Sequence, residues 1–211
     1  MREKDVVNQA EAQHLVTGSD LYLAGDYKQS VVHLREALKI NPGSGHNHFI
    51  LALALTGLGQ LTDAVEEHQE ALRLGYETTG AYYHLGGVLL RLGRLDEGVV
   101  ASQKALSVGG NDEERALVYY NLGTTYLGKR EFDVAAEALR ASLSLNPNYA
   151  SAHMVLGHVY FNQEQFDEAI VEYNTALLLD PTLINARKAR SIAYMGKKQF
   201  LKGVTEWFKP Q

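Results

Sequence analysis

Small and large apolar residues alternate along the chain at spacings of three and four, the period of one face of an α-helix. A small residue returns at steps of 34, 34, 37, 34 and 34 residues, and a leucine or tyrosine stands three positions after each one. These small residues are Gly18, Ala52, Gly86, Gly123, Gly157 and Ser191. Because the same pattern recurs in register, the sequence predicts a repeat array.

Each repeat is predicted to contain two antiparallel helices, called A and B. Small residues let the two helices approach closely where they cross, and large apolar residues fill the space beside them. In the fifth repeat we expect helix A over residues 150–162 and helix B over residues 167–179. Pro42, Pro147 and Pro181 are predicted to end B helices, since proline lacks the N–H group and clashes with the preceding turn.

The third repeat carries three extra residues in the segment 109–115. Asn111 and Glu114 stand three residues apart there, which is the spacing of a capping box. The next A helix is therefore predicted to begin at this point.

The spacing of small residue, aromatic residue, small residue and proline over 34 residues resembles the tetratricopeptide repeat family. The resemblance implies an all-α, right-handed superhelical solenoid of antiparallel helix pairs. One departure concerns the position near the start of helix A, where the family most often has an aromatic residue. This chain has His14, His48, Tyr82, Tyr119, His153 and Arg187 there. The predicted boundaries are a lead-in at 1–10, repeats at 11–44, 45–78, 79–115, 116–149 and 150–183, and a sixth repeat or C-terminal cap at 184–211 that includes a second helix.

Composition narrows the function further. The 211 residues are 45% hydrophobic and carry a net charge of −5, so the chain can bury a core and is not predicted to bind nucleic acid. It contains no cysteine, which excludes disulfides and thiolate chemistry. No apolar stretch is long enough to cross a membrane, and the polar N-terminus does not resemble a signal peptide. We therefore expect a cytoplasmic protein.

The eight histidines do not predict a metal site or a catalytic site. Pairs such as His46 and His48, or His153 and His158, diverge on a helix, whereas a zinc site needs three or four converging ligands. His14, His48 and His153 are interpreted as packing residues. No phosphate-binding glycine loop is present either. The sequence thus predicts no enzyme activity, no metal and no cofactor.

In the family that this chain resembles, the A helices line a concave surface on which partners bind. The resemblance therefore implies a non-enzymatic protein–protein interaction scaffold that binds a peptide or a partner protein in this groove. The alternatives are a superhelix so tightly curled that the residues bury one another, and the regulatory or targeting part of a larger enzyme. Stand-alone bacterial arrays of this kind serve pilus assembly or magnetosome organisation, and no motif selects either. The expected groove contacts are Phe49, Tyr83, Tyr120, Asn121, Met154, His158, Phe161 and Asn162.

Charge is unevenly distributed along the chain. Residues 150–183 contain no basic residue, whereas residues 184–211 contain seven lysines and arginines against one glutamate. The basic C-terminal surface is expected to comprise Arg187, Lys188, Arg190, Lys197, Lys198 and Lys202. Three interpretations remain: contact between copies giving a homo-oligomer, peripheral contact with an anionic membrane, or an ordinary solvated cap.

Overall fold

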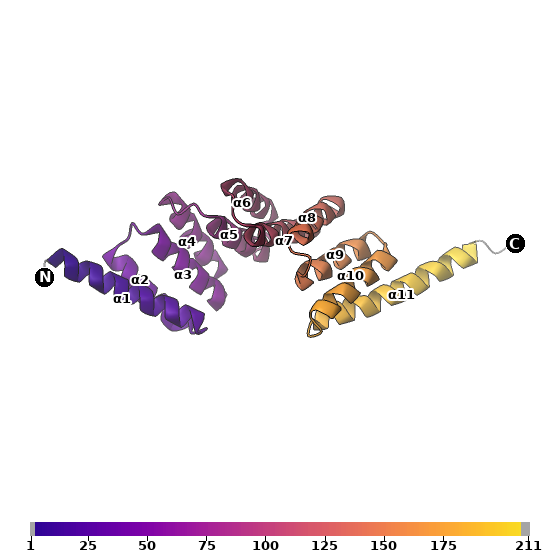
Figure 1. Cartoon of the computed structure of the whole chain (residues 1–211), viewed down its shortest axis with the longest axis horizontal. Coiled ribbons are helices and arrows are strands. Elements are labelled where there is room, and N and C mark those ends of the chain that lie inside the picture. The colour runs from indigo at the N-terminus through magenta and orange to yellow at the C-terminus, as the bar shows by residue number, and fades with distance from the viewer. Residues whose placement is uncertain (1–2, 208–211) are drawn as a thin grey trace. The chain divides into compact units, whose positions relative to one another are not determined.

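The computed structural model describes the backbone of residues 3–207 and the side chains of residues 9–198 (Figure 1). Residues 3–207 form eleven helices and contain no strand, which confirms the all-α repeat fold. The chain divides into two compact units, residues 1–109 and residues 110–211. Each unit is described separately below.

The N-terminal unit contains three helix pairs, in which each helix packs against the next one along the chain. Its buried core is formed mainly by leucine, valine and alanine side chains such as Leu34, Leu51, Leu55 and Val88. The helices are α1 (Glu3–Leu23), α2 (Tyr27–Ile40), α3 (Gly45–Leu58), α4 (Leu61–Arg73), α5 (Thr79–Arg91) and α6 (Leu95–Val108).

The C-terminal unit contains two helix pairs and one further helix. Its cores lie between α7, α8 and α9, around Leu139 and Leu156, and between α9, α10 and α11, around Ile170 and Tyr173. The helices are α7 (Asp112–Lys129), α8 (Phe132–Leu145), α9 (Ala150–Asn162), α10 (Phe166–Leu179) and α11 (Ile184–Trp207). The predicted helices of the fifth repeat agree with α9 and α10 to within one residue.

Helix ends follow the sequence signals. Within the described residues, α2, α8 and α10 each stop two residues before Pro42, Pro147 or Pro181. The predicted capping box is present at the start of α7: the Asn111 side chain accepts from the Glu114 N–H group, and the Glu114 carboxylate accepts from the Asn111 N–H group.

Both ends of the array differ from the prediction. Helix α1 already starts at Glu3, so the expected lead-in over residues 1–10 belongs largely to helix A of the first repeat. At the other end, α11 continues from Ile184 to Trp207 as one helix, where the sequence predicted a helix pair. Gly196 lies inside α11 at a close-packed position: a Cβ atom there would lie 2.7 Å from Cε1 of Phe166, as one at Gly57 in α3 would lie 2.7 Å from Cδ1 of Tyr27.

Candidate functional site

Histidines at the start of helix A are held by contacts within the chain. In repeat 2, Nδ1 of His48 lies 2.5 Å from Oε2 of Glu67, and Nε2 lies 3.1 Å from the carbonyl oxygen of Pro42. In repeat 5, His153 makes the same two contacts with Glu172 and Pro147, at 2.6 and 3.0 Å. These histidines therefore tie helix A to helix B and to the preceding turn, which fits their interpretation as structural residues.

The partner of each histidine stands nineteen residues later in the chain, and we call this arrangement the i, i+19 pair. In repeat 1 the pair consists of two histidines, His14 and His33, whose Nδ1 atoms are 3.2 Å apart. Among the residues that the structure describes, no group of three or more histidine or carboxylate side chains could hold a metal ion.

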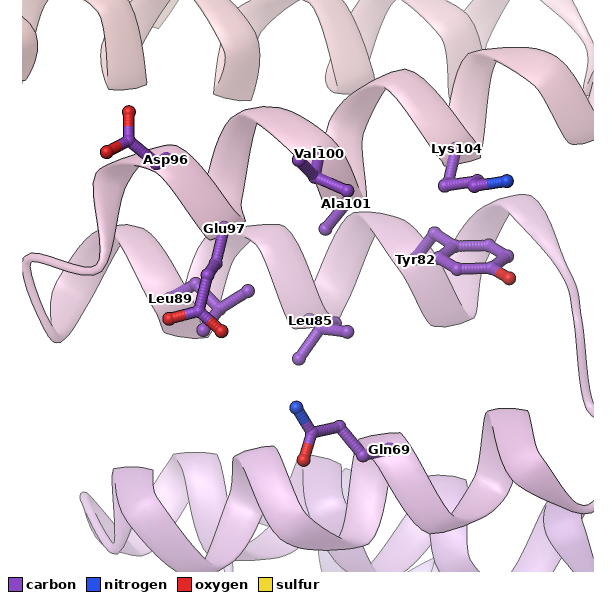
Figure 2. Close-up of a pocket in the computed structure, with 9 residues that line it drawn as sticks. All are labelled: Gln69, Tyr82, Leu85, Leu89, Asp96, Glu97, Val100, Ala101 and Lys104. Carbon is purple, nitrogen blue, oxygen red and sulfur yellow. The ribbon is translucent and has the colours of Figure 1, made fainter.

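Repeats 3 and 4 have tyrosine and alanine at the i, i+19 pair, and a groove replaces the histidine–glutamate contact. The groove of repeat 3 has a volume of about 320 Å³ and contains Tyr82 and Ala101. In Figure 2, Tyr82, Leu85 and Leu89 lie on one helix beneath Ala101 on the next, and Gln69 points toward them from a third. The corresponding groove of repeat 4 contains Tyr119 and Ala138 and has a volume of about 250 Å³. We call these two hollows the outer grooves.

The expected contact residues of the N-terminal unit belong to a cluster of rings. The centroid of the half-buried Phe49 ring lies 5.1 Å from that of Tyr76 and 5.8 Å from those of His68 and His84. Tyr83, also half-buried, lies 4.9 Å from His84 in an edge-on orientation. We call these five residues the N-terminal aromatic cluster; it brings together helices α3, α4 and α5 and the turn that contains Tyr76.

The histidines of this cluster are held in the neutral form. His68 is fully buried and neither of its ring nitrogens has a hydrogen-bond partner, so burial lowers its pKa to about 3, helped by repulsion from His84. Burial also lowers the pKa of His84. At neutral pH the N-terminal aromatic cluster therefore presents an uncharged surface of ring faces and edges.

The expected contact residues of the C-terminal unit are more closely integrated into the core. Tyr120, Met154 and Phe161 are half-buried and pack against buried core residues. The Tyr120 ring lies 4.9 Å from Tyr149, and burial raises the pKa of the Tyr120 hydroxyl. The ring of the half-buried His158 lies 5.4 Å from Tyr173, and burial lowers the pKa of His158.

Met154 also lines an open hollow of about 490 Å³, together with residues that connect α10 to α11 and begin α11. Its other lining residues are Thr182, Leu183, Ile184, Asn185 and Lys188. Met154 thus combines a core contact with exposure to a hollow, a position from which a side chain can touch a partner.

The two asparagines predicted to grip a peptide backbone are arranged differently from the expectation. Asn121 is only 7% exposed, so its amide lies within the packed repeat and is not presented at the surface. Asn162 is exposed, but its Nδ2 group donates to the carbonyl oxygen of His158 at 2.8 Å. We therefore omit Asn121 from the candidate contacts and retain Asn162 only as a peripheral residue.

The basic residues of α11 fall into two groups. Arg187 donates to the carbonyl oxygen of Pro181, Arg190 donates to Oδ1 of Asn174, and Lys197 pairs with Asp167. Lys188 and Lys198 are exposed. The side chain of Lys202 lies outside the described residues.

Comparisons with known proteins agree with this description. Two tetratricopeptide repeat profiles match residues 77–148 and 120–183. A comparison with curated proteins gave no match. Similar solved structures include PilF of Pseudomonas aeruginosa, with 23% identity, a TM-score of 0.70 and coverage of 93% of this chain and 94% of that one.

Two further structures share the fold. A MamA fragment from Desulfovibrio magneticus RS-1 has 19% identity and a TM-score of 0.73, with coverage of 83% of this chain and 97% of that one. YrrB, described as a TPR protein with an unusual peptide-binding site, has 19% identity and a TM-score of 0.68, with coverage of 84% and 90%. In the part of the chain that the structure describes, no helix is both long and apolar enough to cross a bilayer.

Proposed function

Because the chain belongs to the tetratricopeptide repeat family, we propose that it is a non-enzymatic scaffold that binds a peptide segment of a partner protein along its A helices. The N-terminal aromatic cluster is the centre of the proposed surface. In the C-terminal unit, Met154 and Phe161 form a separate candidate contact region.

The observation that carries this proposal is that the rings of Phe49 and Tyr83 are only partly buried. Both rings are half-buried against other rings, so they are held in place while part of each remains accessible. Rings that are fixed before binding lose little conformational entropy when a partner arrives, and aromatic residues dominate the binding energy of many interfaces. The histidines beside them are neutral, so an apolar side chain of the peptide can approach without removing water from a charged group.

The comparison with YrrB supports the same reading, because that protein is described as having a peptide-binding site. The half-exposed residues of the N-terminal aromatic cluster offer ring faces and the phenol hydroxyls of Tyr76 and Tyr83, and none of the five residues is a lysine or arginine. A peptide with an aromatic or aliphatic anchor residue fits such a surface better than an acidic peptide does.

Two adjacent tyrosines provide a matched test. Tyr83 belongs to the N-terminal aromatic cluster, whereas Tyr82 lines an outer groove. Peptides would be selected from a displayed library on the full chain, and their affinities measured by fluorescence polarisation. We expect Tyr83→Ala to weaken binding by about 1–3 kcal/mol and Tyr82→Ala to leave it nearly unchanged. Circular dichroism of both variants would verify that they fold.

A library that yields no binder would contradict the proposed function. Loss of binding in Tyr82→Ala alone would place the peptide in the outer groove. If Tyr83→Ala unfolds the N-terminal unit, the ring is a core residue and the surface assignment is wrong.

A further inference from the structure

Helix α11 presents a face that combines exposed aliphatic side chains with exposed lysines. Ile184, Ile192 and Met195 are 60%, 50% and 57% exposed. Lys188 and Lys198 are exposed on the same helix. We call these five residues the α11 face.

The sequence spacing keeps the α11 face on one side of the helix. Lys188 follows Ile184 by four residues, Ile192 follows Lys188 by four, and Met195 and Lys198 follow at steps of three. Residues three and four apart are neighbours on a helix surface. The opposite side of α11 contains Ala186 and Ala193, which are fully buried.

Among the described side chains of α11, the other three cations point back into the C-terminal unit. Arg187, Arg190 and Lys197 are occupied by Pro181, Asn174 and Asp167, respectively. Contacts within the chain therefore explain these three residues. They do not explain Lys188 and Lys198, or the aliphatic side chains between them.

We propose that the α11 face binds the surface of an anionic lipid bilayer. At such a surface, apolar side chains reach below the headgroups, while the long lysine side chains extend upward to the phosphates. Residues 184–198 contain no acidic residue that would repel the headgroups. Each lysine near an anionic surface adds to the attraction, and the aliphatic contacts add a component that does not depend on salt.

A second copy of the chain is a less suitable partner, because four acidic groups of its two acidic repeats are already paired within the chain. Asp167 pairs with Lys197 and Glu172 with His153 in the acidic fifth repeat. In the acidic second repeat, Glu67 pairs with His48 and Glu70 with Arg73. The acidic surface available to another copy is therefore smaller than the sequence suggests.

The test is sedimentation of the full chain with vesicles of phosphatidylserine and phosphatidylcholine, compared with vesicles of phosphatidylcholine alone. We expect much stronger binding to the anionic vesicles than to the neutral ones, and the difference should shrink when the salt concentration rises from about 0.1 M to about 1 M and the Debye length falls from about 10 to about 3 Å. Lys188→Glu/Lys198→Glu should lower the partition coefficient by roughly tenfold or more.

The control is Lys28→Glu/Lys104→Glu, which makes the same change in net charge at two exposed lysines of the N-terminal unit. It should reduce binding much less, and circular dichroism should show that both double variants fold. Ile192→Ser/Met195→Ser keeps the charge and should weaken mainly the binding that persists at high salt.

Three outcomes would overturn the proposal. The first is a wild-type protein that does not sediment with anionic vesicles, or sediments equally with both kinds. The second is an equal loss in the control variant, which would indicate net charge and not the α11 face. The third is salt-sensitive self-association without vesicle binding, seen by light scattering and lost in Lys188→Glu/Lys198→Glu, which would make a second copy the partner.

Discussion

His48 Nδ1 lies 2.5 Å from Glu67 Oε2 across the two helices of repeat 2, and His153 and Glu172 repeat this contact at 2.6 Å in repeat 5. The side chains of both pairs are largely shielded from water, with the histidines 14% and 15% exposed. The same positions hold Tyr82 and Ala101 in repeat 3, where an outer groove is open. The i, i+19 pair therefore differs between the repeats that have the histidine–glutamate contact and the repeat that has the groove.

A transplanted pair should close the outer groove of repeat 3. In Tyr82→His/Ala101→Glu, the new side chains can form the contact seen in repeat 2. Ala101→Glu alone places a carboxylate against Leu85 and Leu89 in a groove that already contains Asp96 and Glu97, with Lys104 as a flexible cation nearby, so it should destabilise the repeat. The double variant should be more stable than the sum of the single effects by about 1 kcal/mol.

A double-mutant cycle measures this coupling, with the free energy of opening of α5 and α6 obtained from hydrogen exchange. The coupling should be smaller than in repeat 2, where the carbonyl oxygen of Pro42 also contacts the histidine, because the carbonyl oxygen of Tyr76 at the equivalent position already accepts from the Thr78 N–H group. Strictly additive single effects would show that the pair does not form in the new repeat.

Acid should destabilise the N-terminal unit through His68. The pKa of His68 is about 3 in the folded chain and about 6.5 in an unfolded chain, so below pH 6.5 the unfolded state binds a proton that the folded state does not. Stability therefore falls as the pH falls, by about 2 kcal/mol between pH 7 and pH 5, and the fall continues to about pH 3. Well above pH 6.5, His68 is neutral in both states and does not make the free energy of unfolding depend on pH.

His68→Leu should remove most of this acid sensitivity. Leu34 and Leu139 occupy the equivalent position in repeats 1 and 4, both fully buried, so leucine fits the site. At pH 7 the variant should be at least as stable as the wild type, since two buried ring nitrogens without partners disappear. His84 remains, and because burial lowers its pKa too, a smaller sensitivity should persist. Hydrogen exchange of α3 to α5 at pH 7 and pH 5 would check this; an unchanged slope would be inconsistent with a neutral, buried His68.

The helix pairs could be predicted from the sequence because their signal is local and is repeated many times. Small residues at the crossing points, prolines after the B helices and the Asn111–Glu114 capping box each determine backbone geometry within a few residues. Helix α11 could not be predicted in the same way. Gly196 gives no turn signal, because the equivalent Gly57 lies inside α3 and packs against Tyr27 as Gly196 packs against Phe166. The left-handed residue that ends α3 is Gly59, and the last repeat has Lys198 at that position.

The candidate surface was only partly predictable. The sequence register located Phe49 and Tyr83 on helix A, but the Tyr76 turn and the stacked rings of His68 and His84 depend on how adjacent repeats pack. Asn121 was misjudged because an amide on a helix face looks the same in the sequence whether a neighbouring helix covers it or not. The histidine–glutamate pairs could have been found in the sequence, because in two repeats a glutamate follows a helix A histidine by nineteen residues.

Close packing at the small-residue positions gives a final prediction, on Gly157 and Gly86. A Cβ atom at Gly157 would lie 2.6 Å from Cε1 of Tyr173, a ring that is 1% exposed and has no room to move. At the equivalent Gly86 the nearest atom would be Oγ of the small Ser102, at 3.2 Å. Overpacking of a rigid core typically costs about 1–3 kcal/mol, whereas replacing a helical glycine by alanine gains roughly 0.5–1 kcal/mol.

Gly157→Ala should therefore destabilise α9 and α10 by about 1–3 kcal/mol, and Gly86→Ala should change the stability of α5 and α6 by less than about 1 kcal/mol. Hydrogen exchange resolved by helix measures both effects separately, which matters because the two glycines lie in different units. The variants are matched in chemistry and in repeat position, so they differ only in the residue opposite. Equal effects would mean that the size of that residue does not determine how closely the two helices of a repeat approach.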